Sequence, residues 1–219
     1  MALFADGKLD HNFHELTALE KLVYLLFIRP RWDRERRFFF EGSFTLPGQM
    51  YIADRKALFE TIRDEKPADC FEIGTYTGGG STFFITQAFK AVGFGRLVTL
   101  ESSDHLFNKA SSHYARFFRG LSPFVTFVHG AGFDDLKPFM KDGKVGAFFL
   151  DGAENGQETL DQYLRFIPYC RKGTVLMAHD WNTEKTRLLR PAIERGDLWE
   201  KIVEVRPPAS VGFVAFRHR

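Results

Sequence analysis

The sequence predicts an α/β protein with one seven-stranded sheet, mostly parallel with an antiparallel last strand, and with helices on both faces. From residue 51 onward, short apolar runs alternate with longer stretches of helical pattern. The runs are apolar throughout, which is typical of parallel strands that are covered on both faces. The last two runs are joined by a short connection, so they are expected to pair antiparallel. A chain of 219 residues is long enough for one sizeable core.

The N-terminal part carries a helical pattern of its own. Between residues 13 and 28, apolar side chains recur at helical spacing, and Pro30 is expected to end this helix. The stripe comprises Leu16, Leu19, Leu22, Val23, Leu26 and Phe27. The arginine-rich run 29–37 is interpreted as a solvated connector and the aromatic-rich stretch 38–48 as an irregular connection. We expect residues 1–50 to form a helical cap, whose helix docks on the core, docks on a second subunit of a homo-oligomer, or acts as a lid.

Residues 51–219 supply the elements of the expected main domain. The expected strands are 70–73, 95–101, 124–128, 145–150, 174–178, 201–205 and 211–216. The expected helices are 51–64, 82–90, 104–118 and 157–166. Ser81 and Ser103 stand where a hydroxyl can cap the helix that follows.

A glycine-rich turn follows the first strand, in the stretch Cys-Phe-Glu-Ile-Gly-Thr-Tyr-Thr-Gly-Gly-Gly-Ser at 70–81. Glycines let the backbone approach a ligand closely, and the free N–H groups at a helix start suit an anionic group. The dinucleotide pattern G-x-G-x-x-G fails because its third glycine would fall on Phe83, and a phosphate loop would have Gly80 in place of its lysine. An acid, one spacer and G-x-x-x-G are matched by Glu72, Gly74 and Gly78. Similar turns also occur in α/β folds that bind no ligand at this position.

Polar side chains follow several of the expected strands directly. Glu101, Asp151, His179 and Asp180 all stand at carboxyl ends, which meet at the edge of a parallel sheet where ligands bind. Two carboxylates on neighbouring strand ends can hold Mg²⁺. His179, whose ordinary pKa is close to neutrality, can instead take a proton or only orient a neighbour. Asp151, His179 and Asp180 are therefore the candidate catalytic residues.

The acid with its G-x-x-x-G turn resembles motif I of the class I S-adenosylmethionine-dependent methyltransferases. The Asp-Gly pair at 151–152 and the His-Asp pair at 179–180 are similar to strand ends of the small-molecule O-methyltransferases. The resemblance extends over about residues 51–219. It implies a Rossmann-like fold, S-adenosylmethionine as cofactor, and a small-molecule hydroxyl as acceptor. It also implies a divalent metal such as Mg²⁺ on Asp151 and Asp180, with His179 as base or orienting group; a metal-free route through His179 stays open.

The same resemblance implies a set of cofactor contacts. Gly74, Thr75 and Tyr76 would line the methionine part, Gly80 or Ser81 would meet its carboxylate, and Glu101 would accept hydrogen bonds from the ribose hydroxyls. The whole set is Glu72, Gly74, Thr75, Tyr76, Gly78, Gly80, Ser81, Glu101, Ser102, Ala131, Phe133 and Asp151. Residues 129–133 offer no acid to face the adenine, so backbone N–H groups and Phe133 are expected there. Glu154 stands where relatives often carry histidine.

Composition narrows the partners. The formal net charge of +2 gives no attraction toward nucleic acid or an anionic membrane. Two cysteines make no disulfide framework, and neither a signal peptide pattern nor a membrane-spanning stretch is evident, so a cytoplasmic protein is expected. Because a fold does not determine chemistry, a hydroxylase-like metal enzyme and a non-catalytic binding module that keeps the cofactor pocket remain alternatives.

Overall fold

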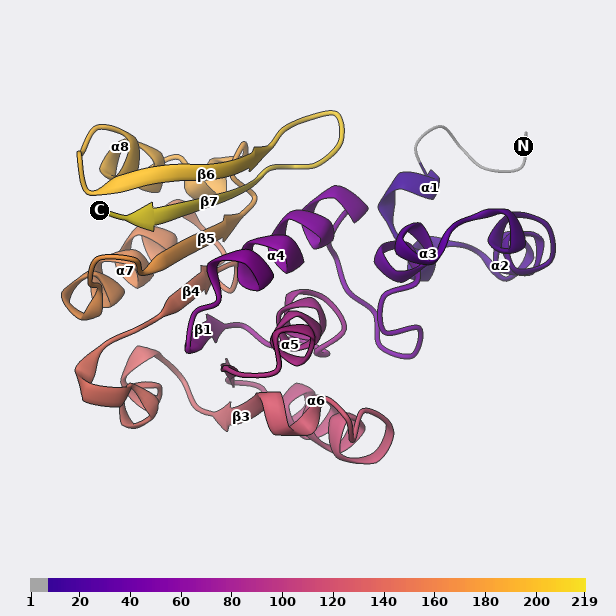
Figure 1. Ribbon diagram of the computed structural model, residues 1–219, viewed down its shortest axis with the longest axis horizontal. Coiled ribbons are helices and arrows are strands. Elements are labelled where there is room, and N and C mark those ends of the chain that lie inside the picture. The colour runs from indigo at the N-terminus through magenta and orange to yellow at the C-terminus, as the bar shows by residue number, and fades with distance from the viewer. Residues whose placement is uncertain (1–7) are drawn as a thin grey trace.

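The computed structural model describes residues 8–219 and contains a seven-stranded sheet in the order β3-β2-β1-β4-β5-β7-β6 (Figure 1). The strands are β1 (Asp69–Ile73), β2 (Arg96–Glu101), β3 (Val125–His129), β4 (Ala147–Leu150), β5 (Val175–His179), β6 (Trp199–Val205) and β7 (Phe213–His218). The first five strands pair in parallel, and β7 runs antiparallel to both β5 and β6. The predicted fold class is confirmed.

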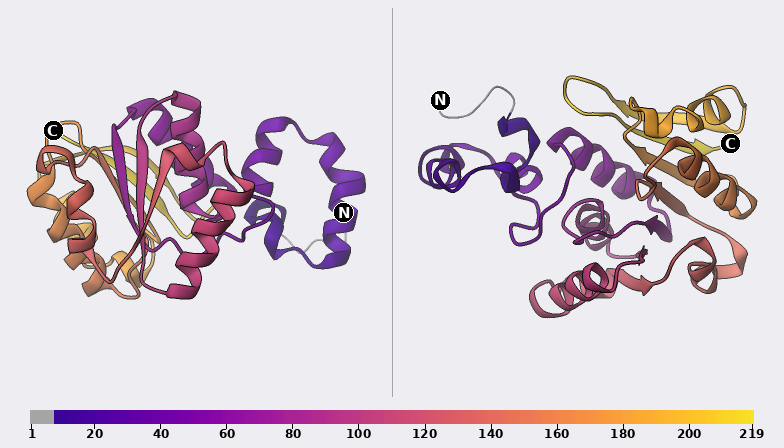
Figure 2. Two further views of the ribbon diagram at one scale, coloured as in Figure 1. Left: turned by 90° about the horizontal axis from the view of Figure 1, so that it is seen from below. Right: turned by 180° about the vertical axis from the view of Figure 1, so that it is seen from behind.

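Helices cover both faces of the sheet (Figure 2). The α-helices that follow residue 50 are α4 (Ile52–Glu65), α5 (Ser81–Val92), α6 (Asp104–Phe117), α7 (Gly156–Phe166) and α8 (Leu189–Glu194). Successive strand residues point to opposite faces, and each face has its own core. Phe149 of β4 packs in the core that contains α4, α5 and Tyr114 of α6, whereas Phe148 packs in the core that contains α7 and α8. Burial on both faces explains why the strands are apolar throughout.

Short turns of helix connect these elements. They are η4 (Ser122–Phe124), η5 (Phe133–Asp135), η6 (Lys137–Phe139), η7 (Lys141–Gly143), η8 (Ile167–Tyr169) and η9 (Glu184–Thr186). Ser103 caps α6 as expected, since its hydroxyl accepts the Leu106 N–H at 3.4 Å. The prediction that Ser81 caps α5 is wrong, because Gly80 is the N-cap residue and Ser81 is the first residue of the helix.

The N-terminal segment is not the single helix predicted for residues 13–28. It consists of α1 (Lys8–His11), η1 (Phe13–Glu15), α2 (Ala18–Val23), the π-helical turn η2 (Tyr24–Ile28), η3 (Arg29–Arg31) and α3 (Arg34–Glu41). The break comes from a capping box: Thr17 accepts the Glu20 N–H, and the Glu20 carboxylate accepts the Thr17 N–H at 2.7 Å. The expectation that 38–48 is irregular is also wrong for its first residues, which continue α3 after the Asp33 N-cap.

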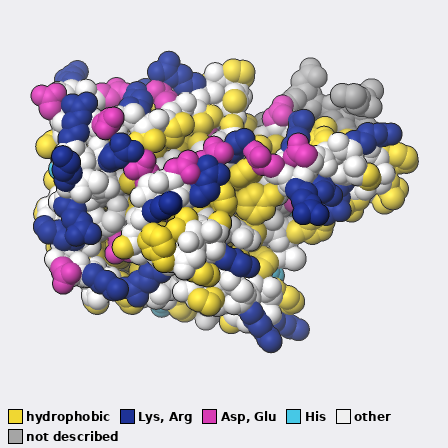
Figure 3. All heavy atoms as spheres, viewed as in Figure 1, with side chains coloured by type: hydrophobic (Ala, Val, Ile, Leu, Met, Phe, Trp, Pro, Cys, Tyr) yellow, Lys and Arg dark blue, Asp and Glu magenta, His cyan; other side chains and the backbone are white. Residues whose placement is uncertain are grey.

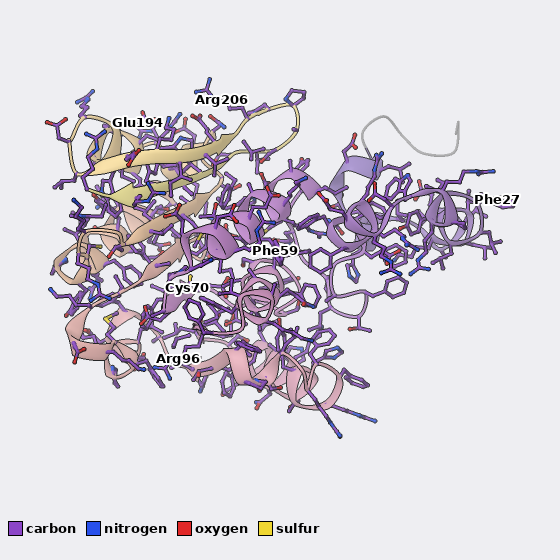
Figure 4. All side chains as sticks on the ribbon, viewed as in Figure 1. Phe27, Phe59, Cys70, Arg96, Glu194 and Arg206 are labelled. Atoms are coloured by element: carbon purple, nitrogen blue, oxygen red, sulfur yellow. The ribbon has the colours of Figure 1, made fainter. Side chains whose placement is uncertain are left out.

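The predicted apolar stripe is mostly exposed. Phe13, Leu16, Tyr24 and Phe40 are buried in a small core within the segment, whereas Phe39 packs in the core that contains α4 and α5. Leu19, Leu22, Leu26 and Phe27 each keep more than half of their surface exposed. Phe27 lies at the outer end of the segment (Figure 4), where hydrophobic side chains are visible on the surface (Figure 3). The spacing identified helical residues but not the face that is buried. The division into a cap of residues 1–50 and a main domain stays a prediction, and residues 1–7 of that cap lie outside the described residues.

Candidate functional site

The end of β1 closely approaches the end of β4, at the point where the strand order reverses. Gly74 has a φ of +96°, and its N–H bonds the Leu100 carbonyl oxygen at 2.9 Å. A Cβ on Gly74 would lie 2.7 Å from the Cα of Gly152, and a Cβ on Gly152 would overlap the carbonyl oxygen of Ile73. Only glycine fits at both positions. Such a reversal point is where open α/β sheets bind ligands.

The remainder of the glycine turn packs against residues 46–48, which we call the connector. The Thr77 hydroxyl donates to the Pro47 carbonyl oxygen at 2.7 Å, and the Tyr114 hydroxyl donates to the Gly78 carbonyl oxygen at 2.8 Å. A side chain on Gly79 would overlap backbone oxygens of the connector, and Gly80 lies against Gly48. Because these two glycines have no side chains, the backbone of the connector can pack directly on the turn.

Glu72 supports the turn from beneath. Its fully buried carboxylate accepts hydrogen bonds from the hydroxyls of Ser81, Thr82 at 2.7 Å and Thr99 at 2.6 Å. Burial raises the pKa of Glu72 above its ordinary value, although the three hydroxyls favour the charged form. The Thr75 hydroxyl continues the network to Thr99 at 2.6 Å. The network fixes the turn to β1 and β2.

A cavity of about 750 Å³ lies at the carboxyl ends of β1, β2, β4 and β5. Its lining includes Gln49, Tyr51, Ile73, Gly74, Tyr76, Leu100, Glu101, Ser102, Leu106, Ala131, Asp151, Gly152, Glu154, Glu158, Gln162, His179, Asp180, Lys185 and Val211. A pocket of about 480 Å³, which contains Phe133, shares Ile73, Ala131, Glu158 and Gln162 with it. The volume is in the range of small-molecule and cofactor sites.

The expected site residues divide into two groups by position. Gly74, Tyr76, Glu101, Ser102, Ala131 and Asp151 line the cavity, and Phe133 lines the adjoining pocket. Glu72, Thr75, Gly78, Gly80 and Ser81 line neither, because they are engaged in the hydroxyl network or in packing beneath the turn. Glu154 lines the cavity as an exposed residue.

Glu101 is held in a defined orientation at the end of β2. One carboxylate oxygen accepts the Tyr76 N–H at 2.8 Å, and the other accepts the Ser103 N–H at 2.9 Å. A carboxylate oxygen has two lone pairs, so each retains capacity for a further donor from the cavity. The arrangement suits a ligand with a pair of hydroxyl groups.

Asp151, His179 and Asp180 come together as predicted, with Asp54 and Lys185 beside them. We call these five residues the charge cluster. The imidazole of His179 is buried, with Nε2 at 3.1 Å from Asp54 Oδ2 and Nδ1 at 3.4 Å from Asp151 Oδ1. Burial lowers the pKa of His179, but the hydrogen bonds to Asp151 and Asp54 outweigh it and raise that pKa to about 10. At neutral pH the imidazole is therefore protonated, with each ring nitrogen facing a carboxylate.

Lys185 of η9 completes the charge cluster. Its Nζ lies 3.1 Å from Asp151 Oδ1, 2.6 Å from the Asp151 carbonyl oxygen and 3.0 Å from Asp180 Oδ2. Burial lowers the pKa of Lys185, but the two aspartates raise it above its ordinary value. Burial alone would raise the pKa of Asp151, yet His179 and Lys185 bring it below its ordinary value. The aspartate and its two cationic neighbours thus stabilise one another.

Two residues of the charge cluster, Asp54 and Lys185, were not predicted from the sequence. Asp54 lies one and two helical turns before Leu58 and Ile62 of α4, so a charge on the buried face was a readable signal. Lys185 had no such signal, because the three-residue turn η9 is too short to show a periodic pattern.

The donor atoms partly fit a divalent cation. Asp151, His179 and Asp180 each offer one ligand atom, and these atoms lie within 4.8 Å of one another. Two carboxylates suit Mg²⁺, whereas imidazole suits transition metals better. The ammonium of Lys185 contacts the same two carboxylates.

The fold is that of the class I methyltransferases. The sequence matches a family model described as "Methyltransferase domain" over residues 71–181, about half of the chain. The chain belongs to this family, so the resemblance seen in the sequence is confirmed. The family assignment favours a methyltransferase over the hydroxylase-like and non-catalytic alternatives. Among curated proteins, no sequence matches significantly.

Solved structures of methyltransferases share the fold at low sequence identity. An O-methyltransferase from Bacillus cereus in complex with SAH has a TM-score of 0.63 at 20% identity, covering 93% of this chain and 98% of that one. A putative O-methyltransferase from Klebsiella pneumoniae has a TM-score of 0.63 at 19% identity, covering 90% and 94%. TomG from Streptomyces achromogenes, an O-methyltransferase involved in tomaymycin synthesis and solved with SAM, has a TM-score of 0.62 at 17% identity, covering 92% and 96%. Within residues 8–219, no helix is long and apolar enough to span a lipid bilayer.

Proposed function

We propose that the protein transfers the methyl group of S-adenosylmethionine to a hydroxyl of a small molecule. The observation that carries the proposal is one cavity lined by the oriented Glu101 carboxylate and by four residues of the charge cluster, Asp151, His179, Asp180 and Lys185. The first suits a ribose, and the second can position an acceptor and receive its proton. Structural neighbours that bind SAM or SAH support the cofactor.

The cofactor would extend along the edge of the sheet. In this arrangement Glu101 accepts hydrogen bonds from the ribose hydroxyls, and Gly74 and Tyr76 lie beside the methionine part. Ser102 and Ala131 lie next to the ribose and the base. The adjoining pocket with Phe133 would receive the adenine. The sulfonium carries a positive charge, which the nearby carboxylate of Asp151 would attract.

The acceptor would occupy the remaining part of the cavity. Gln49 and Tyr51 come from the segment before α4, and Val211 comes from the loop before β7. Side chains on such connecting segments commonly set the specificity of a site that a rigid scaffold supports. We assign these three residues to acceptor contacts.

Methyl transfer requires the acceptor oxygen to be aligned with the methyl carbon and to lose its proton. The new bond joins that oxygen to the methyl carbon, the carbon–sulfur bond breaks, and the sulfonium becomes a neutral thioether. We assign Asp180 as the group that receives the proton. Its Oδ2 accepts a hydrogen bond from Lys185, but its Oδ1 lies 3.7 Å from His179 Nδ1, which is too far for a hydrogen bond, so Oδ1 can accept the proton. His179 acts as an orienting group, since both of its ring nitrogens face carboxylates. The divalent ion that the sequence led us to expect on Asp151 and Asp180 would lower the pKa of the acceptor hydroxyl, but the transfer described here does not depend on it.

Ligand-dependent melting and product detection test the proposal. At about 100 times its dissociation constant, a ligand should stabilise the protein by about 2.7 kcal/mol. We expect SAM and SAH, but not NADH or ATP, to raise the melting temperature. We also expect SAH to form when SAM is incubated with a panel of phenols, catechols and alcohols. Methylation of amines or thiols alone would overturn the hydroxyl assignment, and stabilisation by NADH or ATP without any effect of SAM and SAH would overturn the cofactor.

A further inference from the structure

We propose that Lys185 is a built-in cation that takes the place of a divalent metal between Asp151 and Asp180. The role of Lys185 in the reaction rests on the proposed function, but the test of cation binding does not require turnover. Sequence patterns suggest a metal because the two carboxylates meet at neighbouring strand ends. The side chain that lies between them supplies the positive charge from the chain itself.

The position of the ammonium is specific. A lysine ammonium has three N–H donors, and Nζ of Lys185 has three acceptors: the Asp151 carbonyl oxygen, Asp151 Oδ1 and Asp180 Oδ2, at 2.6, 3.1 and 3.0 Å. Every donor is therefore matched by an acceptor. A surface lysine that merely approaches an acid does not meet this condition.

The loop that carries Lys185 is also held in place. The Thr183 hydroxyl donates to the Asp180 carbonyl oxygen at 2.9 Å, and the single proton of the Thr186 hydroxyl is shared between the carbonyl oxygens of Trp181 at 2.8 Å and Asp180 at 3.0 Å. These bonds fold the loop back onto the end of β5. The lysine backbone is fixed near the carboxylates, so holding the ammonium there costs less side-chain entropy than for a lysine on an open loop.

A divalent ion and the ammonium compete for the same oxygens. An ion that bound Asp151 Oδ1 and Asp180 Oδ2 at about 2.0 to 2.6 Å would lie in the space next to Nζ, where like charges repel strongly. Asp151 Oδ1 is in addition faced by His179 Nδ1 at 3.4 Å. Binding of an ion would require Lys185 to leave, and the ion would find a histidine instead of a third oxygen ligand.

The charge balance agrees with a site that works without a metal. The charge cluster has three carboxylates, one lysine and one histidine that lies between two of those carboxylates. The cofactor sulfonium would bring a further positive charge into the same cavity. A divalent ion in addition to Lys185 would place an excess of positive charge beside the sulfonium, so only one of the two cations is expected.

Direct measurement of cation binding tests the inference. Mn²⁺ is titrated into the protein with SAH present, and free Mn²⁺ is followed by its electron paramagnetic resonance signal. We expect no saturable binding to the wild type up to the highest Mn²⁺ concentration used. Lys185→Ala, in which the carboxylates lose their cation, should bind Mn²⁺ saturably, with a dissociation constant at least about 10-fold below that concentration. Lys185→Arg, which keeps the charge, should behave as the wild type. Lys172→Met, a change of an exposed lysine before β5, is the matched control.

The outcomes separate the inference from the proposed function. Saturable Mn²⁺ binding by the wild type that Asp180→Asn abolishes would overturn the inference, as would a Lys185→Ala variant that binds no more Mn²⁺ than the wild type. Lys185→Met provides the same comparison if the alanine variant fails to fold. With an active preparation, the wild type should keep its turnover after exhaustive chelation, and Mn²⁺ should partly restore turnover to Lys185→Ala. If no preparation transfers a methyl group, the proposed function fails while the Mn²⁺ titration still decides the role of Lys185.

Discussion

Replacing Glu101 by alanine tests the cofactor site most directly. The change removes a carboxylate that accepts two backbone N–H groups at 2.8 and 2.9 Å and that is proposed to accept the ribose hydroxyls. Hydrogen bonds to a charged group contribute about 1.5 to 3 kcal/mol each. Loss of one such bond to the ribose should weaken SAH binding by about 10- to 150-fold. Isothermal titration calorimetry with SAH measures the effect.

The melting temperature and a control variant separate the two roles of Glu101. The free variant should also melt at a lower temperature, because the N–H groups of Tyr76 and Ser103 lose their acceptor. Glu200→Ala, on the far edge strand β6, is the matched control and should change neither quantity. If Glu101→Ala lowers the melting temperature but binds SAH within twofold of the wild type, Glu101 only orders the turn and our reasoning about the ribose is refuted.

Three other changes have defined outcomes. The pKa of His179 is raised to about 10, so its charge stabilises the fold fully below about pH 6.5 and less as pH rises toward 10, and the free energy of unfolding should fall over this window by at most about 1.4 kcal/mol per pH unit. In urea titrations at pH 6, 8 and 10, Asp54→Asn should show a weaker dependence on pH than the wild type, and an equal dependence would contradict the ion pair. The methyl group of Gly152→Ala would collide with a backbone oxygen, so this variant should lower the free energy of unfolding by more than about 3 kcal/mol. Gly132→Ala, with nothing within 4 Å of the added carbon, should change the free energy of unfolding by less than about 0.5 kcal/mol, and similar values for the two variants would argue against the close approach of β1 and β4. Deleting residues 1–50 should expose core surface and reduce solubility or acceptor turnover more than SAH affinity, and a truncated protein that is soluble and fully active would contradict the cap.

The fold was predictable because its information is local. A strand such as β4 is buried on both faces, so its apolar run is visible in four residues whatever lies around it. The N-terminal segment was not predictable in the same way. Leu19 and Leu22 fit a helical stripe as well as Leu16 does, but only tertiary packing decides that Leu16 is buried and the other two are exposed.

The site was predictable where strand ends bring residues together. Parallel pairing places Asp151 and His179 at one edge without any knowledge of loops. The partners of His179 come from elsewhere: Asp54 reaches it from α4, and Lys185 reaches Asp151 from a loop closed by threonine hydroxyls. Conformations of this kind follow from contacts between distant segments, and no periodic pattern encodes them.

The packing of residues 46–48 on the glycine turn constrains how two distant parts of the sequence can change during evolution. A side chain at Gly79 has no space because the connector carbonyls already fill it, and Thr77 is bonded to Pro47. An insertion in the connector would change the space over the turn, and a larger residue in the turn would push the connector away. During evolution the two segments can therefore change only in concert, so the N-terminal region is not an interchangeable attachment on an otherwise complete enzyme.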